Sequence, residues 1–147
     1  MVPTEVPGVR VHPGAVRLSV ASHFDAASNM GGEYAPTPKM LEEAIRKAIQ
    51  RTSIFAEIDP QAPVELSVLL RSVEQDLDVD AVHVALDWKL LDAASKTVLW
   101  RQRIETTGTD KSFAAAVRLR NGSEAAFRNN IATAFQEISA LEFQVRS

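Results

Sequence analysis

The chain has no cysteine among its 147 residues, and this absence removes two classes of small protein. No disulfide framework can form, and no zinc-ligand set can be assembled from three scattered histidines, His12, His23 and His83. We therefore expect no metal site and no cofactor. The lack of disulfides does not choose between cytosol and periplasm.

Long hydrophobic runs and an excess of positive charge are also missing. No stretch approaches the roughly 20 apolar residues of a membrane-spanning helix, and residues 1–8 lack the basic and then apolar layout of a signal peptide. The net charge of −3 argues against nucleic acid as a partner, because phosphate binding needs a concentrated basic surface. Hydrophobic residues make up 46% and charged residues 24%, which is typical of one soluble globular domain of this length.

Proline and glycine are concentrated at the start of the chain. Residues 1–14 contain Pro3, Pro7, Gly8, Pro13 and Gly14, which disfavour both a helix and a strand interior. We interpret this segment as an extended tether and residues 15–147 as a single domain. The tether is either an ordinary frayed terminus or the remainder of a longer region that carried a signal and an anchor.

Four segments alternate between apolar and polar residues, a pattern that predicts strands with one face on a core. They lie at residues 16–21, 64–70, 82–90 and 98–104. The second segment changes phase, because its apolar positions are even up to Leu70 and odd at Val73, Leu77 and Val79. Either a bulge or a hairpin turn near residues 74–80 would explain the change. Residues 92–96 form a polar turn between the last two segments.

Two amphipathic helices are expected. The first begins with Thr37 as its N-cap and Pro38 at the first helical position, and it ends around residues 51–53. The second has Asn121 and Glu124 in capping-box spacing. Its apolar face consists of Phe127, Ile131, Ala134, Phe135, Ile138 and Leu141. The order β-α-β-β-β-α predicts an α+β, two-layer sandwich: a mainly antiparallel four-stranded sheet with two helices on one face.

Catalytic patterns fail when they are tested against the sequence. A calcium loop counted from Asp76 has Ala81 where glycine is needed and Asp87 where glutamate is needed. An active site would require a cleft that gathers His23, Asp25 and Glu33, and their closeness in sequence is no evidence of such geometry. We therefore predict that the protein is not an enzyme.

The open face of the predicted sheet is the one candidate binding surface. If even positions face the helices, odd positions share the other face, and five basic residues lie among them. These are Arg17, Arg71, Lys89, Arg101 and Arg103. The simplest interpretation is a solvated face of mixed charge; the alternative is a docking face for an acidic lipid head group or partner. Leu69, Leu91 and Leu99 on the same side favour partial coverage by something else.

The second half of the chain resembles a group of bacterial envelope proteins. The resemblance is carried by residues 82–90, the turn at 92–96, residues 98–100 and 104–107, and above all residues 118–131. At the level of pattern it spans residues 15–141. The group comprises small α+β lipoproteins: the auxiliary lipoproteins of ABC-type lipid transport and the LptE-like lipopolysaccharide-assembly lipoproteins. It implies a signal peptide and a lipidated cysteine upstream of residue 1, and it offers no catalytic residues to carry over.

From these observations we expect a periplasm-facing domain, anchored in the outer membrane by an N-terminal lipid, that serves an envelope assembly or transport machine as an accessory or scaffold. Its partner would be another envelope protein. One alternative is a carrier that holds a small amphiphile between sheet and helices against Phe127, Ile131 and Phe135. Another is a cytosolic assembly subunit that dimerises through the exposed edge of its sheet.

Overall fold

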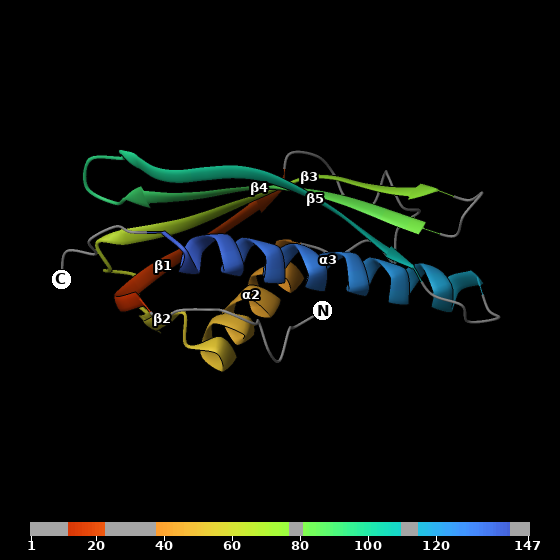
Figure 1. Ribbon diagram of the computed structural model, residues 1–147, viewed down its shortest axis with the longest axis horizontal. Helices are drawn as coiled ribbons and strands as arrows, with labels where there is room; N and C mark the ends of the chain where they lie inside the picture. The colour runs from red at the N-terminus through yellow and green to blue at the C-terminus, as the bar shows by residue number, and fades with distance from the viewer. Residues whose placement is uncertain (1–11, 23–37, 77–80, 110–114, 142–147) are drawn as a thin grey trace.

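The computed structural model describes residues 12–22, 38–76, 81–109 and 115–141. Within them a five-stranded sheet lies across two helices (Figure 1). Both helices lie against the same face of the sheet, so the predicted two-layer α+β architecture is confirmed. The elements are β1 (His12–Ser22), α2 (Pro38–Thr52), β2 (Phe55–Ile58), β3 (Val64–Asp76), β4 (Ala81–Asp92), β5 (Val98–Thr109) and α3 (Ala115–Ser139).

The sheet differs from the prediction in strand number and in direction. Its order is β2-β1-β3-β4-β5, and β1 runs parallel to both of its neighbours, whereas β3, β4 and β5 are antiparallel. The expectation of four strands is therefore one strand short, and the expectation of a mainly antiparallel sheet is confirmed only for β3, β4 and β5. The missed strand β2 has only four residues, too few to display alternation. The long crossover through α2 permits the parallel pairing of β1 with β3, because parallel neighbours cannot be joined by a tight turn.

The predicted tether and the first strand overlap. Residues 1–11 lie outside the described part of the chain, whereas β1 already includes His12, Pro13 and Gly14. The pairing of β1 with β2 is irregular between His12 and Ala15, and Gly14 has a φ of 109°. Proline and glycine are thus accommodated at an irregularity at the start of the strand, where the regular ladder is interrupted.

Helix α2 matches its predicted bounds. It begins at Pro38, while the expected cap Thr37 lies outside the described residues. The helix stops at Ser53, whose φ of 54° places it in the left-handed region and whose N–H donates to the Ile49 carbonyl oxygen at 2.8 Å. Met40 is apolar but half exposed. The buried residues of the helix are Leu41, Ala44, Ile45, Ala48 and Ile49.

A bulge in β3 accounts for the change of phase. Leu70 pairs with Leu86 and Ser72 pairs with Ala85, so Arg71 is the extra residue. After the bulge, the odd-numbered Val73 is buried in the core. The prediction of a bulge is confirmed, although it lies slightly before residues 74–80; Leu77 and Val79 fall outside the described residues.

The turn between β4 and β5 is confirmed at its predicted place. Asp92 Oδ1 accepts hydrogen bonds from the backbone N–H groups of Ala94 and Ser95, both at 3.0 Å. Lys96 has a φ of 62°, and its N–H donates to the Asp92 carbonyl oxygen at 2.8 Å. An aspartate side chain that caps the turn in this way fixes the hairpin.

Helix α3 begins earlier than predicted. It starts at Ala115, so Asn121 lies inside the helix and is not its cap. The expected apolar face is otherwise confirmed: Phe127, Ile131 and Phe135 are fully buried. Gly122 sits where α3 crosses the end of β5 at Gly108, and this close crossing explains a glycine in a helix interior.

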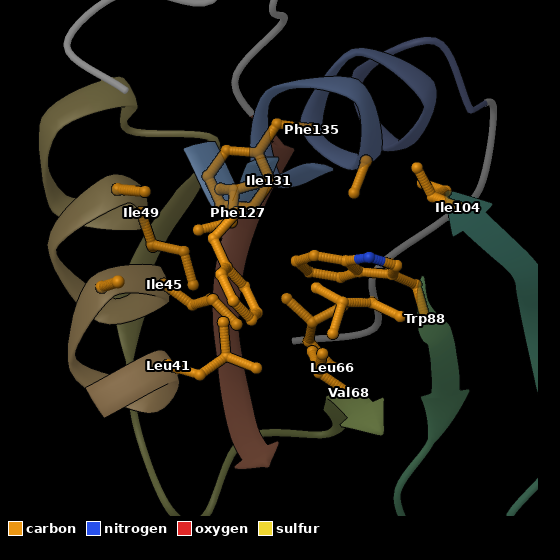
Figure 2. Packing of buried hydrophobic residues seen from close by; sticks show 14 of the residues in the cluster. Leu41, Ile45, Ile49, Leu66, Val68, Trp88, Ile104, Phe127, Ile131 and Phe135 are labelled. Atoms are coloured by element: carbon orange, nitrogen blue, oxygen red, sulfur yellow. The ribbon is translucent and has the colours of Figure 1, made fainter. Parts of the chain in front are cut away.

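The core fills the space between the sheet and the helices. Figure 2 shows Leu41, Ile45 and Ile49 of α2 pointing toward Phe127 of α3, with Trp88 of β4 beside them. Trp88 meets Phe135 edge to face, with ring centroids 6.4 Å apart. Its indole N–H donates to Asn130 Oδ1 at 2.8 Å, and Asn130 Nδ2 donates to the Ile104 carbonyl oxygen at 2.8 Å. This buried amide ties α3 to both β4 and β5.

Candidate functional site

The face of the sheet opposite the helices carries a hollow of about 730 Å³. Its walls come from β1, β3, β4 and β5. The lining residues are Ala21, Ser67, Leu69, Arg71, Asp87, Lys89, Arg101, Gln102 and Arg103. Four of the five basic residues predicted from the sequence therefore border one hollow.

Strand register brings these side chains together. Ser67 of β3 pairs with Lys89 of β4, which pairs with Arg101 of β5. In the next row of the same face, Asp87 lies between Leu69 and Arg103. Because alternate residues share a face and strands lie about 4.8 Å apart, the two rows form a compact patch.

Asp87 organises one side of the hollow. Its Oδ1 accepts a hydrogen bond from Arg103 Nε at 2.8 Å, and its Oδ2 lies 3.3 Å from Arg71 Nε. The hydrogen bond to Asp87, together with the charge of that carboxylate, raises the pKa of Arg103 above the usual arginine value. Both guanidiniums are thus held over β4. One of them belongs to Arg71, the extra residue of the bulge in β3.

Lys89 and Arg101 form a pair of a different kind. They are directly opposite each other on neighbouring strands, and both are exposed. Within the described residues neither makes an ion pair with a carboxylate. Like charges in direct cross-strand register destabilise a sheet by some tenths of a kcal/mol, up to about 1 kcal/mol. With one carboxylate among four cations, the hollow carries an excess of positive charge although the chain as a whole is acidic.

Arg17, the fifth predicted residue, lies elsewhere. It lines a second hollow with Arg46 and Glu65, and its Nε donates to the Ala62 carbonyl oxygen. Its register partner is Glu65, which pairs in turn with Leu91, so this row runs past the end of the basic patch. The sequence identified the correct face, but the position along the strands required the register.

Asp87 also lines the hollow, although the site prediction left it out. Its place on the open face was evident from the alternation, but its ion pairs with Arg71 and Arg103 depend on how the three strands are aligned. Of the three leucines expected on this face, Leu69 lines the hollow, Leu91 is buried and Leu99 is 41% exposed on β5.

The three residues that an active site would have to gather lie outside the described part of the chain: His23, Asp25 and Glu33 are all in residues 23–37. Across the residues with assigned positions, no group of three or more His, Cys, Asp or Glu side chains could hold a metal ion. Nor is any helix in those segments long and apolar enough to cross a membrane.

Comparison with known proteins gives a fold and no sequence relative. The chain matches no protein-family model and no curated protein. Among solved structures it is similar to a Xanthomonas campestris protein of the family DUF330, with a TM-score of 0.64 and 17% identity over 90% of this chain and 85% of that one. PelC from Paraburkholderia phytofirmans, solved as a dodecamer, gives a TM-score of 0.55 and 18% identity over 87% of each chain. A candidate lipoprotein from Caulobacter crescentus gives 0.52 and 18% over 84% of this chain and 87% of that one.

The protein therefore has a small bacterial lipoprotein-like fold. The resemblance seen in the sequence is confirmed at that level. At these identities the likeness concerns the fold alone, and it does not distinguish an LptE-like protein from a transport auxiliary.

Proposed function

We propose that the protein is a non-catalytic, periplasm-facing lipoprotein domain that acts as an accessory or scaffold in an envelope assembly or lipid-transport machine. The observation that carries the proposal is the gathering of Arg71, Lys89, Arg101 and Arg103 around one hollow on the sheet face that the helices leave uncovered. A domain of this design binds through its open face while the helices close the core behind it. The fold shared with a candidate lipoprotein and with DUF330 supports the envelope assignment.

The chemistry of the hollow favours recognition. Its charged groups are guanidinium and ammonium donors around a carboxylate that already accepts hydrogen bonds from arginine. Arginine forks match carboxylate and phosphate oxygens in geometry as well as in charge. A partner that presents acidic groups would therefore dock here.

An N-terminal lipid would hold this face near the membrane. A single acyl chain anchors a protein only marginally, so stable attachment needs more than one chain or additional contacts. A triacylated cysteine upstream of residue 1 would satisfy that need, with residues 1–11 linking it to β1. The position in the outer membrane is part of the same proposal.

The intact mass of the native protein from the membrane fraction tests this proposal. A mass that exceeds the polypeptide by a lipidated N-terminal cysteine is the expected result. An unmodified polypeptide in the soluble fraction would overturn the envelope assignment and favour the cytosolic assembly subunit.

The cytosolic alternative has one structural observation in its favour, because β5 forms an edge of the sheet. The dodecameric PelC shows that a protein of similar fold can self-associate. Light scattering at high concentration tests this alternative, and a monomer would remove it. The amphiphile carrier is less well supported, because Phe127, Ile131 and Phe135 are fully buried in the packed core (Figure 2).

A further inference from the structure

The outer edge of β5 is divided into a covered and an uncovered stretch. In the described part of the chain, β5 pairs with β4 on one side and with no strand on the other. Helix α3 holds the second half of β5: Thr106 Oγ1 donates to the Ala126 carbonyl oxygen at 2.6 Å, and Asn130 Nδ2 donates to that of Ile104 at 2.8 Å. Figure 1 shows this half of the strand descending to the start of α3. No described strand pairs with residues 98–103 on this side, and they form the uncovered stretch.

The uncovered stretch is also the basic wall of the hollow. Arg101 and Arg103 are two residues apart on one face, so their backbone positions are about 6.7 Å apart along the strand. Val98 and Leu99 continue the same stretch and are 46% and 41% exposed. Within the described residues, this edge presents N–H and C=O groups that pair with no strand, beside two arginines and an apolar end.

We propose that an extended acidic segment of a partner protein adds to residues 98–103 as a sixth strand, with carboxylates at alternate positions over Arg101 and Arg103. This inference rests on the proposed function, since it names the partner chemistry for the same face. Main-chain hydrogen bonds supply affinity in strand addition, and alternate side chains supply specificity. A carboxylate at every second residue repeats at the same spacing as the two arginines. Lys89, one strand further in, adds to the positive field.

Charge argues against a second copy of this chain as the source of the sixth strand. Two β5 edges paired through residues 98–103 would bring four arginines together on one face. Like charges across strands oppose pairing, whereas an acidic strand relieves the repulsion between Lys89 and Arg101. The partner is therefore acidic where this edge is basic.

The test uses the full chain and three synthetic peptides. The first alternates valine and glutamate over nine residues, the second has the same composition with its glutamates in one block, and the third is the first peptide N-methylated at alternate amides. Titration calorimetry should show that the alternating peptide binds at least about tenfold more tightly than either of the others. If the peptide with its glutamates in one block, or the methylated peptide, bound as tightly as the alternating peptide, strand addition would be overturned, because only net charge would then be recognised.

Protein variants locate the site. The double variant Arg101→Ser/Arg103→Ser should weaken binding of the alternating peptide about tenfold. The matched control Lys47→Ser/Arg51→Ser removes the same charge from exposed positions of α2, on the other side of the sheet, and should change binding by less than about twofold. Equal losses in both double variants would overturn the assignment to β5.

Two further results separate this inference from the proposed function. If pyrophosphate or anionic phospholipid vesicles bind in an Arg101- and Arg103-dependent way and the alternating peptide does not, the partner is not an acidic strand and the inference fails while the binding face stands. If the native protein lacks a lipid and the peptide binds as expected, the envelope assignment fails and strand addition stands.

Discussion

The crossing of Gly108 and Gly122 gives the sharpest prediction about stability. A Cβ built on Gly108 would collide with the carbonyl oxygen of Gly122, and it would lie 2.5 Å from the backbone nitrogen of Ala126 and 3.0 Å from Ala125 Cβ. Two of these atoms belong to the helix backbone and cannot rotate away. The substitution Gly108→Ala therefore requires α3 to move off the end of β5.

The expected cost combines strain with lost hydrogen bonds. Forcing an extra methyl group into a packed site costs about 1–3 kcal/mol, and each hydrogen bond that weakens between α3 and β5 adds about 0.5–1.5 kcal/mol. Two of these bonds, from Thr106 to Ala126 and from Asn129 to Thr107, lie close to the crossing. We expect Gly108→Ala to lower the free energy of unfolding by about 2–4 kcal/mol, which for a chain of this length lowers Tm by about 5–15 °C.

Gly122→Ala is the matched control, because it places the same methyl group on the other partner of the crossing. Its Cβ would lie 3.3 Å from the Gly108 carbonyl oxygen and 3.4 Å from Val82 Cγ2, so the neighbours need to move only slightly. Alanine in a helix interior gains about 0.5–1 kcal/mol over glycine, which offsets that small movement. Urea unfolding followed by circular dichroism should show a large loss for Gly108→Ala and a change of less than about 1 kcal/mol for Gly122→Ala. Equal losses in the two variants would refute the packing argument.

Three further substitutions follow from single contacts. Asn130→Leu leaves the indole N–H of Trp88 buried without its acceptor, and urea unfolding should show a free energy of unfolding lower by about 1–3 kcal/mol. The control Asn129→Ala, at an exposed position, should lower it by less than about 1 kcal/mol. Similar losses in the two variants would contradict the buried hydrogen bond. Ser53→Gly relieves a left-handed residue after α2 and should raise Tm by an amount equivalent to about 0.5–1 kcal/mol, and a lower Tm would show that Ser53 is not strained. Lys89→Glu converts a repulsive cross-strand pair into an attractive one and should raise stability by about 0.2–1 kcal/mol while weakening binding of the alternating Val-Glu peptide; a stability loss would contradict the register of β4 and β5.

Local patterns predicted the elements that touch the core on one face only. The alternation in β3, β4 and β5 and the stripe of α2 each record burial on one side, so their existence could be inferred from the sequence alone. Strand β2 could not, because a four-residue strand next to a helix carries no period. Strand direction also could not, since parallel and antiparallel neighbours of β1 present the same side chains to the core.

The start of α3 was missed because two explanations compete for one motif. Asn121 and Glu124 have the spacing of a capping box, yet Gly122 lies inside the helix because β5 passes close to it. A glycine retained for a long-range contact looks like a helix boundary in the sequence. The contact itself links residues 108 and 122 and depends on how α3 crosses the sheet.

The sequence predicted which face of the sheet carries the candidate site, but not where on that face the site lies. Alternation assigned five cations to the open side of the sheet, and register then grouped four of them around one hollow while leaving Arg17 with Glu65. Arg71 is the extra residue of the bulge in β3, and its Nε lies 3.3 Å from Asp87 Oδ2. A bulge shifts the register by one residue, which local propensity does not encode.

Lys89 and Arg101 connect these observations to function. A cross-strand pair of like charges lowers the stability of the free domain, and a carboxylate at either position would raise it. Asp87, in the row next to that of Lys89 and Arg101, shows that a carboxylate on this face can form ion pairs with two arginines. Among the described residues the row of Lys89 and Arg101 contains no carboxylate, and the acidic strand proposed beside β5 would supply one. An acidic partner would therefore relieve the repulsion between Lys89 and Arg101, which gives the proposed docking a physical reason.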